Sequence, residues 1–169
     1  MSCRIHAFTN SRSYGLTRFP LHRWLAIDHG TKRIGLAVGD APAGVASPLA
    51  VIDAQPLAAA IKRILRFAAD YEACGIVVGW PINDDGSEGD QGKLARGMAL
   101  ELERTAGMDV RLWDERLSSF EADKALAGTM TRLQKRRRQD AVAAAAILRD
   151  FLAANGPSAA KRPSEIKAK

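Results

Sequence analysis

Four acidic residues stand where carboxylates can do chemistry. Asp28 follows a short apolar run, residues 24–27, and Asp114 and Glu115 end a second strand-like run that begins at residue 109. Asp140 precedes an alanine-rich segment that is typical of a helix. In an open α/β sheet, reactive groups gather at the carboxyl ends of parallel strands, and the first turn of a neighbouring helix can reach the same place. We therefore expect acids from three distant parts of the chain to meet at one edge of a sheet.

Such a cluster favours a divalent metal ion. Ionised carboxylates that lie close together repel one another, and a cation relieves the repulsion. Mg²⁺ or Mn²⁺ suits oxygen ligands, and two ions about 3.5–4 Å apart can bind a phosphate, activate water and stabilise a leaving oxygen. The predicted metal ligands are Asp28, Asp114 and Asp140. Glu115 is a further catalytic candidate, but strand alternation points it away from Asp114, so we expect only one of the two to face the metal and slightly favour Asp114.

Each acid also has a purely structural interpretation. Asp140 can complement the dipole at the start of a helix. Asp114 can pair with Arg116 on the surface, and Asp28 can belong to the turn that contains Gly30. The three acids taken together favour a site more strongly than any one of them does.

Basic residues accompany the acids. Lys32 and Arg33 follow Asp28 in the first turn, and Arg116 follows Glu115. A basic run directly before Asp140 adds Lys135, Arg136, Arg137 and Arg138. We expect these side chains to bind phosphates of a nucleic-acid backbone, the alternative being a solvated turn and linker. Aromatic residues make up only 6% of the chain, which argues against base stacking as the main binding mode.

The net charge of +6 is unevenly distributed over the 169 residues. Residues 1–27 carry +4, residues 155–169 carry +3, and the part between them carries −1. A nearly neutral body with cationic patches suits a nucleic-acid partner. No apolar run approaches the roughly 18 residues of a membrane span, so no membrane contact is expected. Two distant cysteines form no disulfide framework, which favours a reducing cytoplasm.

The hydrophobic periodicity predicts an α/β domain over residues 23–154. A meander of three strands precedes alternating helices and strands, which gives a five-stranded mixed sheet with helices on both faces. The expected strands are 24–28, 33–40, 46–52, 75–80 and 109–116. The expected helices begin at Pro56, at residue 93, after the capping box of Ser118 and Glu121, and at Asp140. Residues 1–22 and 155–169 are expected to be disordered basic extensions, because both are poor in apolar residues.

Four segments carry a family resemblance: LAIDHGTKRIGLAVGD, IVVGWPINDDGSEG, WDERLSS and QDAVAAAAIL, in this order. Together they resemble the YqgF/RuvX family, whose members are named as pre-16S rRNA nucleases and as Holliday-junction resolvases. The resemblance covers residues 24–153. It implies a ribonuclease H-like fold and a hydrolase that cleaves phosphodiesters with Mg²⁺ or Mn²⁺. It also implies 5′-end maturation of 16S ribosomal RNA on the pre-ribosome in the bacterial cytoplasm.

The resemblance extends to single positions. Asp28 matches the first-strand aspartate of the family, residues 114–116 match its D-E-R, and Asp140 matches the aspartate of its last helix. Many ribonuclease H-like nucleases carry an acid at the end of the fourth strand. Here Gly79 and Pro81 occupy that place, so the set of acids must be completed from WDER.

Three other functions are weighed against RNA cleavage. Resolution of branched DNA requires a dimer with two symmetric sites, and we expect a monomer or a weak homodimer. A non-catalytic RNA-binding factor for ribosome biogenesis would keep the fold without using the acids. An ATP-binding module would share the hairpin IDHGTKRIGLAV, but such enzymes clamp nucleotide between two lobes and this chain has length for one.

Overall fold

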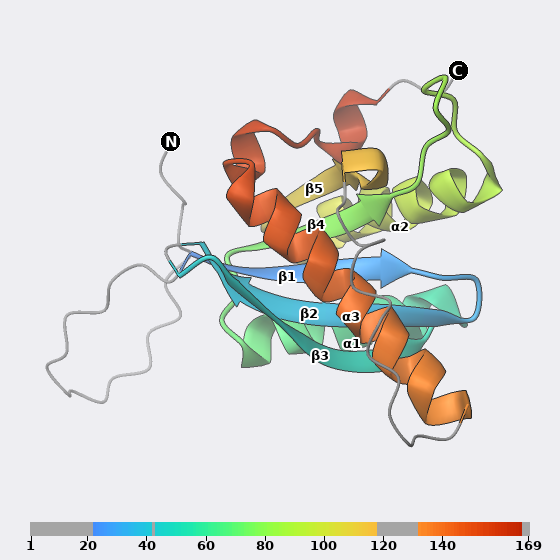
Figure 1. Ribbon diagram of the computed structural model, residues 1–169, viewed down its shortest axis with the longest axis vertical. Coiled ribbons are helices and arrows are strands. Elements are labelled where there is room, and N and C mark those ends of the chain that lie inside the picture. Colours follow the sequence, from blue (N-terminus) through green and yellow to red (C-terminus); the bar gives the residue numbers. More distant parts are fainter. Residues whose placement is uncertain (1–21, 42, 118–131, 167–169) are drawn as a thin grey trace, which may run out of the picture.

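The computed structural model describes residues 22–41, 43–117 and 132–166, without the side chains of residues 117 and 132–138. One five-stranded sheet forms the centre of the molecule, with strand order β3-β2-β1-β4-β5 (Figure 1). The strands are β1 (Arg23–His29), β2 (Arg33–Asp40), β3 (Val45–Asp53), β4 (Gly75–Trp80) and β5 (Asp109–Asp114). β1, β2 and β3 form an antiparallel meander, while β4 and β5 run parallel to β1. The mixed five-stranded sheet predicted from the sequence is confirmed.

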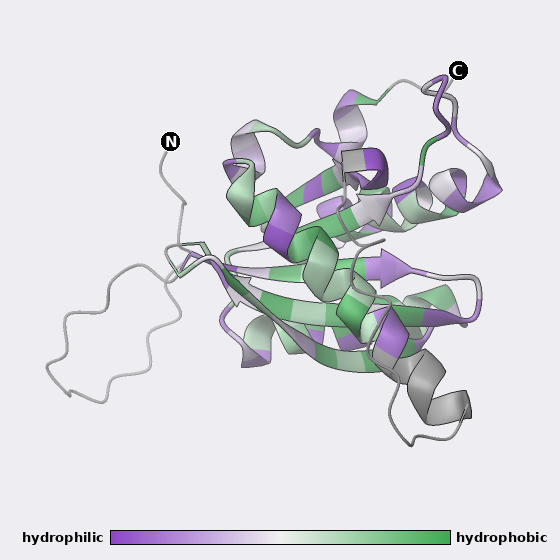
Figure 2. Ribbon diagram, in the orientation of Figure 1, coloured by the Kyte–Doolittle hydropathy of each residue, from purple (hydrophilic) through white to green (hydrophobic). Residues whose placement is uncertain are grey.

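Helices cover both faces of the sheet, as expected. α3 (Arg132–Ala153) crosses one face over β1, β2 and β3, and α1 (Leu57–Asp70) and α2 (Asp90–Ala106) lie on the other (Figure 1). β4 is buried along its whole length, as a strand covered on both faces should be. In Figure 2 the middle of the sheet is hydrophobic, and polar residues gather at its ends and on the outer helix faces.

Strand alternation divides the core into two layers. Leu25 and Ile27 of β1 are fully buried on the α1/α2 side. Trp24 and Ala26 of the same strand are buried against α3, where the ring of Phe151 packs 4.7 Å from that of Trp24. Asp28, two residues beyond Ala26, therefore belongs to the face that α3 covers. This parity decides which side chains can meet Asp28.

α3 begins earlier than expected. The prediction that Asp140 lies in the first turn of this helix is wrong, because the helix starts at Arg132 and Asp140 is its ninth residue. Arginine, lysine and glutamine favour helices, so the basic run continues the helix instead of linking two. Asp140 consequently does not serve the dipole of a helix start.

The predicted disorder of residues 155–169 is wrong for residues 155–166. Short turns of 3-10 helix at Gly156–Ser158 and Pro163–Glu165 lead the chain back along β5. The Leu112 amide donates a 2.8 Å hydrogen bond to the Lys161 carbonyl, and Ala160 and Pro163 are buried. The outer edge of β5 offers backbone groups that need a partner, and this polar segment supplies one despite its low hydrophobicity.

β3 is the other outer strand of the sheet. Pro48 lies inside this strand and not at its start, next to a bulge where the register with β2 shifts between Leu36 and Ala37. An outer strand tolerates proline because half of its backbone N–H groups need no partner in the sheet. In the part of the chain that the structure describes, no helix is long and apolar enough to cross a membrane.

Three predictions lie outside the described residues. The capped helix after Ser118 falls in the segment 118–131, and the extension 1–22 is described only at His22. The side chains of residues 135–138, predicted to bind phosphate, also lie outside what is described.

Candidate active site

Asp28 lies at the carboxyl end of β1, directly beside Gly35 of β2. Its side chain is partly buried under α3. Two glycines flank it, Gly35 on β2 and Gly79 on β4. Gly79 lies next to Asp28 because the residues before them, Val78 and Ile27, are paired. Both glycines leave space that other residues of the site fill.

Gly35 allows α3 to approach the sheet at Asp140. A Cβ atom at Gly35 would overlap the backbone carbonyl of Asp140, so any side chain there would force the helix away. Glycine inside a strand often marks such a close backbone approach. The contact brings Asp140 to the end of β1, and the two carboxylates repel each other enough to contribute to the raised pKa of Asp28.

Arg33 holds the side chain of Asp140. Its Nε donates a 2.6 Å hydrogen bond to Oδ2 of Asp140, and both side chains are about one quarter exposed. Arg33 therefore orients a carboxylate of the site, a role additional to the phosphate binding predicted from the sequence.

Glu115 fills the space above Gly79. A Cβ atom at Gly79 would overlap Oε1 of Glu115, which fixes the place of this carboxylate on the α3 side of β4. Glu115 is the first residue of the 3-10 turn Glu115–Leu117 and shares its face with Trp113, two residues earlier, which packs in the α3 layer. Glu115 thus supplies a carboxylate above the strand end that has none of its own.

The pKa values report how crowded the carboxylates are. Burial, and then the charge of Asp140, raises the pKa of Asp28 to about 6. Burial, and then the charges of Asp28 and Asp114, raises the pKa of Glu115 to about 7. Asp28 therefore interacts electrostatically with both Asp140 and Glu115. Because of this repulsion, the three carboxyl groups are not all fully ionised near neutral pH.

Asp114 faces a different set of partners. Arg116 grips its carboxylate, with Nη2 2.7 Å from Oδ2 and Nε 3.1 Å from Oδ1. Partial burial raises the pKa of Asp114, but the hydrogen bonds from Arg116 outweigh it, and the pKa lies below its usual value. Nη1 of Arg116 also donates to the carbonyls of Asn83 and Asp84, each at 3.1 Å. The Asp114–Arg116 pair thus ties the end of β5 to the polar loop after β4.

That polar loop has an internal anchor that the sequence did not reveal. Glu88 accepts hydrogen bonds from Nε1 of Trp80 at 2.8 Å and from Nε of Arg96 at 2.8 and 3.0 Å. A short bridge between Ile82 and Glu88 closes the loop. Glu88 thus fastens the loop to Trp80 of β4 and to Arg96 of α2.

The predicted basic residues have different surroundings. Lys32 is exposed in the turn between β1 and β2, where it is free to meet solvent or a ligand. Arg33 and Arg116 are committed to Asp140 and Asp114. His29 is 7% exposed and lies on the face opposite Asp28, so its ring does not join the acids.

The donor chemistry fits a hard divalent cation. The carboxylates of Asp28, Glu115 and Asp140 are electrostatically coupled through Asp28, and a cation would remove the repulsion that raises the first two pKa values. Among the described residues, no three His, Cys, Asp or Glu side chains are already arranged to hold a metal ion. One carboxylate oxygen of Asp140 accepts a hydrogen bond from Arg33. The side chains of Asp28, Glu115 and Asp140 would therefore have to turn before all three could contact one ion.

Comparison with known proteins identifies the family. Residues 22–154 match the family described as "RuvX: Holliday junction resolvase". The chain belongs to the RuvX family. A protein of Anaeromyxobacter sp. (strain K) named "Putative pre-16S rRNA nuclease" is 43% identical over 136 residues, which are 80% of this chain and 99% of that protein. A protein of the same name from Paracoccus denitrificans is 42% identical over 75% of this chain and 80% of its own. The expectation of a phosphodiester-cleaving hydrolase is thereby confirmed.

The fold is also that of a known nuclease. The RuvC of Thermus thermophilus, solved in complex with a Holliday junction substrate, superimposes with a TM-score of 0.52 at 16% identity. The match covers 82% of this chain and 98% of RuvC. The ribonuclease H-like fold expected of a RuvX member is thus confirmed, and the likeness at this identity concerns the fold alone.

Proposed function

We propose that this RuvX member is a metal-dependent nuclease that hydrolyses RNA phosphodiesters during 5′-end maturation of the 16S ribosomal RNA precursor. The observation that carries the proposal is the meeting of Asp28, Glu115 and Asp140 from β1, the end of β5 and α3. The relatives named as pre-16S rRNA nucleases support RNA as the substrate. The pre-ribosome in the cytoplasm would be the place of action.

Asp28, Glu115 and Asp140 would hold Mg²⁺ or Mn²⁺. In this assignment Glu115 replaces Asp114, which the sequence slightly favoured, because Glu115 faces Asp28 whereas Arg116 occupies Asp114. A bound ion would supply an activated water and neutralise charge on the phosphate. Asp114 would act through Arg116, by keeping the loop at 83–84 in place beside the acids.

Arg33 would have two roles. It neutralises Asp140 across a 2.6 Å ion pair. If Asp140 turned toward a bound cation, the guanidinium would lose that partner and would be available to a phosphate of the substrate. Lys32, exposed one residue earlier, would add a second backbone contact.

Cleavage assays would test this assignment. A labelled single-stranded RNA that spans the 5′ end of the 16S precursor is incubated with Mg²⁺, Mn²⁺ or EDTA. We expect metal-dependent cutting that falls by more than about 100-fold in Asp28→Asn and Glu115→Gln, beyond the ~10–100-fold typical of residues that only support a metal ligand. Asp114→Asn should fall within that smaller range. If Asp114→Asn is inactive and Glu115→Gln is not, the assignment of the acids is reversed.

A second candidate function follows from the family description. A four-way DNA junction tested in parallel would be cut in preference to RNA if this member resolves Holliday junctions, and the active species would then be a dimer. If wild type and Asp28→Asn bind RNA equally and neither cuts with any metal, the chain is a non-catalytic RNA-binding factor.

A further inference from the structure

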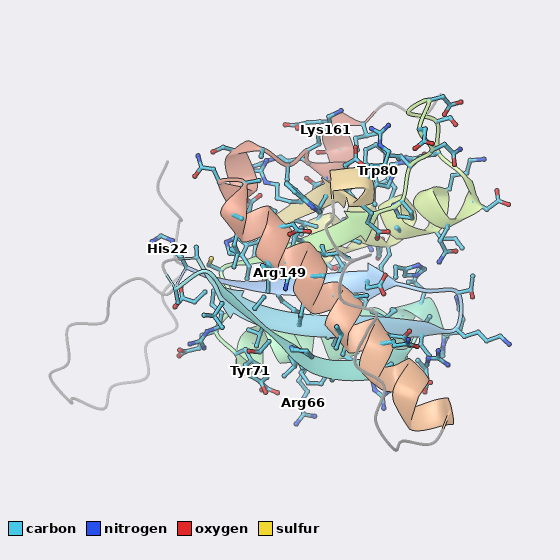
Figure 3. All side chains as sticks on the ribbon, in the orientation of Figure 1. His22, Arg66, Tyr71, Trp80, Arg149 and Lys161 are labelled. Carbon is cyan, nitrogen blue, oxygen red and sulfur yellow. The ribbon has the colours of Figure 1, made fainter. Side chains whose placement is uncertain are left out.

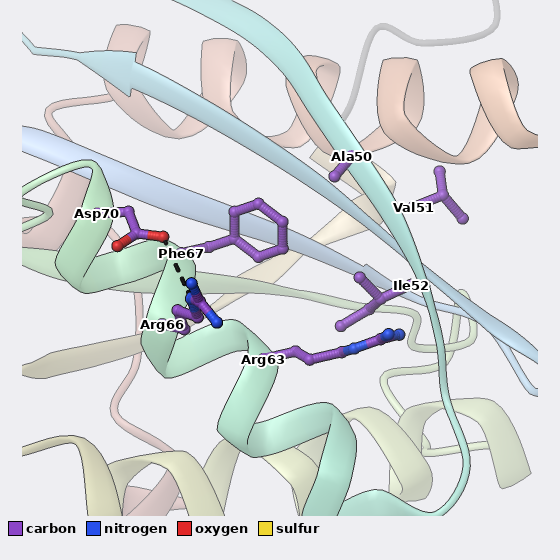
Figure 4. Close-up of a pocket in the computed structure, with 7 residues that line it drawn as sticks. All are labelled: Ala50, Val51, Ile52, Arg63, Arg66, Phe67 and Asp70. Atoms are coloured by element: carbon purple, nitrogen blue, oxygen red, sulfur yellow. Dashed lines mark ion pairs between the residues drawn. The ribbon is translucent and has the colours of Figure 1, made fainter.

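A concave site lies at the opposite edge of the sheet from the β5 segment, between β3 and α1 (Figure 4). This hollow has a volume of about 370 Å³. Four apolar and three charged residues line it: Ala50, Val51, Ile52, Phe67, Arg63, Arg66 and Asp70. We call it the β3–α1 groove. It is on the α1 side of the sheet, whereas the acids of the active site are on the α3 side, so no catalytic residue lines it.

One wall of the groove is an open strand edge. β3 is the outermost strand, paired with β2 on one side, and no described residue pairs with its other side. The backbone of this strand therefore presents N–H and C=O groups that have no partner in the described fold, except at Pro48, which has no N–H to offer. Most side chains of this strand are exposed or half-buried, and Val45 is 57% exposed.

The opposite outer strand shows how this fold treats an edge. The segment around Lys161 covers β5 with a backbone hydrogen bond to Leu112, whereas β3 has no such cover among the described residues. Figure 3 shows Arg66 beside β3, far from Lys161 and Trp80 at the other end of the sheet. The two edges differ, and the edge at β3 borders a hollow.

The other wall of the groove is cationic. Arg63 points along the groove toward Ile52, and no described residue pairs with its guanidinium (Figure 4). Arg66 meets Asp70 at 3.7 Å, but the side chains are 84% and 59% exposed, so the pair is weak. The ring of Phe67 lies between the helix and the strand and provides an apolar floor. The walls thus offer backbone pairing on one side and positive charge on the other.

We propose that the β3–α1 groove binds an extended acidic segment of a partner protein, which adds a strand to β3 and places carboxylates against Arg63 and Arg66. Strand addition uses main-chain hydrogen bonds for affinity and pockets for alternate side chains for specificity. Apolar side chains of the segment would sit over Phe67 and Ala50. Nucleic acid could use the arginines but not the strand edge, so a peptide matches more of what the groove offers.

Neither the N-terminal residues nor the segment that follows α3 suits this role. Residues 1–21 contain three arginines and no acid, so their charge is opposite to what the groove complements. The segment 155–166 is already committed to β5. We therefore assign the groove to a segment of a separate protein, and this assignment does not depend on the nuclease proposal.

A display library of random nonapeptides, selected on the full chain, would test the proposal. We expect enrichment of peptides in which apolar residues alternate with Asp or Glu. A synthesised winner should shift the amide NMR signals of residues 45–53 and 57–70. Arg63→Glu should weaken its binding at least about tenfold by charge reversal. Arg104→Glu, the same change at an exposed arginine of α2, should alter binding less than about twofold.

Other outcomes separate the possibilities. Equal enrichment on wild type and Arg63→Glu, or winners whose signals map elsewhere, would overturn the proposal. If Arg63→Glu weakens binding of a single-stranded RNA instead, the groove is a nucleic-acid site and the peptide assignment is wrong. Asp28→Asn should leave peptide binding unchanged, and Arg63→Glu should leave RNA cleavage unchanged, so failure of the groove and failure of the nuclease proposal are distinguishable.

Discussion

At the scale of single residues, the position of Asp28 is electrostatically costly without a cation. It is partly buried, has Asp140 on one side and Glu115 on the other, and its pKa is raised to about 6. A protein that used Asp28 only as a turn residue would gain nothing from this arrangement. The repulsion is the expected cost of a preformed anionic site, and it can be measured in the metal-free protein.

Neutralising Asp28 should stabilise the metal-free protein at alkaline pH. The carboxyl of Asp28 has a pKa of about 6 in the folded protein against its ordinary 3.8, so the folded protein binds this proton more tightly than the unfolded chain does. The resulting penalty is absent below about pH 4, grows between pH 4 and 6, and is complete above. We expect Asp28→Asn to raise the free energy of unfolding by about 1–3 kcal/mol at pH 8 in EDTA.

Urea unfolding at pH 4, 6 and 8 would measure this effect. The difference between Asp28→Asn and wild type should vanish at pH 4. Excess Mn²⁺ should stabilise wild type more than the variant, because the variant lacks one ligand. If Asp28→Asn is less stable than wild type at pH 8 in EDTA, the ionised carboxylate stabilises the fold and the predicted electrostatic penalty is wrong.

At the scale of secondary-structure elements, the strands could be predicted closely and the site only in outline. The apolar run GIVVGW and the meander before it follow from local pattern, so five strands and the role of β1 were predictable. The choice between Asp114 and Glu115 was not, because alternation tells that they point apart but not which face α3 covers. The face is set by long-range packing of Trp113 and Phe151.

Glycines offered a signal that the sequence interpretation did not use. Gly35 and Gly79 each interrupt an apolar strand, a pattern that marks close approach of another backbone or side chain. In the structure one admits the backbone of Asp140 and the other the carboxylate of Glu115. The start of α3 was misplaced for a different reason: the basic run was placed before the helix as a phosphate-binding segment, although its residues are good helix formers.

Substitution of Gly35 should separate α3 from the sheet. In Gly35→Ala the added methyl group would overlap backbone atoms of Asp140, which cannot rotate away as a side chain can. We expect a loss of about 1–3 kcal/mol in the free energy of unfolding, together with weaker Mn²⁺ binding because Asp140 moves away from Asp28. Denaturant unfolding and calorimetric titration with Mn²⁺ would measure both.

Gly97 provides the matched control. It lies inside α2 with open space where a Cβ would stand, so Gly97→Ala adds the same methyl group without a clash. This change should stabilise the protein by about 0.5–1 kcal/mol, since alanine is the better helix former, and leave Mn²⁺ binding unchanged. Equal effects of the two substitutions would refute the close approach of α3 at Gly35.

At the scale of the whole molecule, the two outer strands of the sheet differ in how their free edges are covered. Residues 156–166 cover β5 through the Leu112 amide and the Lys161 carbonyl and through Arg111 and the Ala160 carbonyl. Ser164 fastens the same segment to Glu103 of α2. The β3 edge stays open among the described residues and borders the β3–α1 groove. Among the described residues, the β3 edge is therefore left for the strand pairing that we propose.

Removal of residues 156–169 should open the second edge. The truncated protein loses the partner of the Leu112 amide and the burial of Ala160 and Pro163. We expect the free energy of unfolding to fall by about 2–3 kcal/mol, from a few hydrogen bonds of ~1 kcal/mol each and the lost apolar contact. The exposed strand edge should also promote self-association at high concentration.

Hydrogen exchange of single amides would localise this change. The Leu112 amide points to Lys161, so by alternation the Trp113 amide points to β4. Truncation should speed exchange at Leu112 at least about tenfold while the Trp113 amide, still paired with β4, changes much less. Ser164→Ala, which removes one hydroxyl contact and leaves the backbone cover of β5 intact, should leave both amides protected. If Leu112 stays protected after truncation, the segment does not seal the edge, and the asymmetry between β3 and β5 no longer explains where a partner strand would bind.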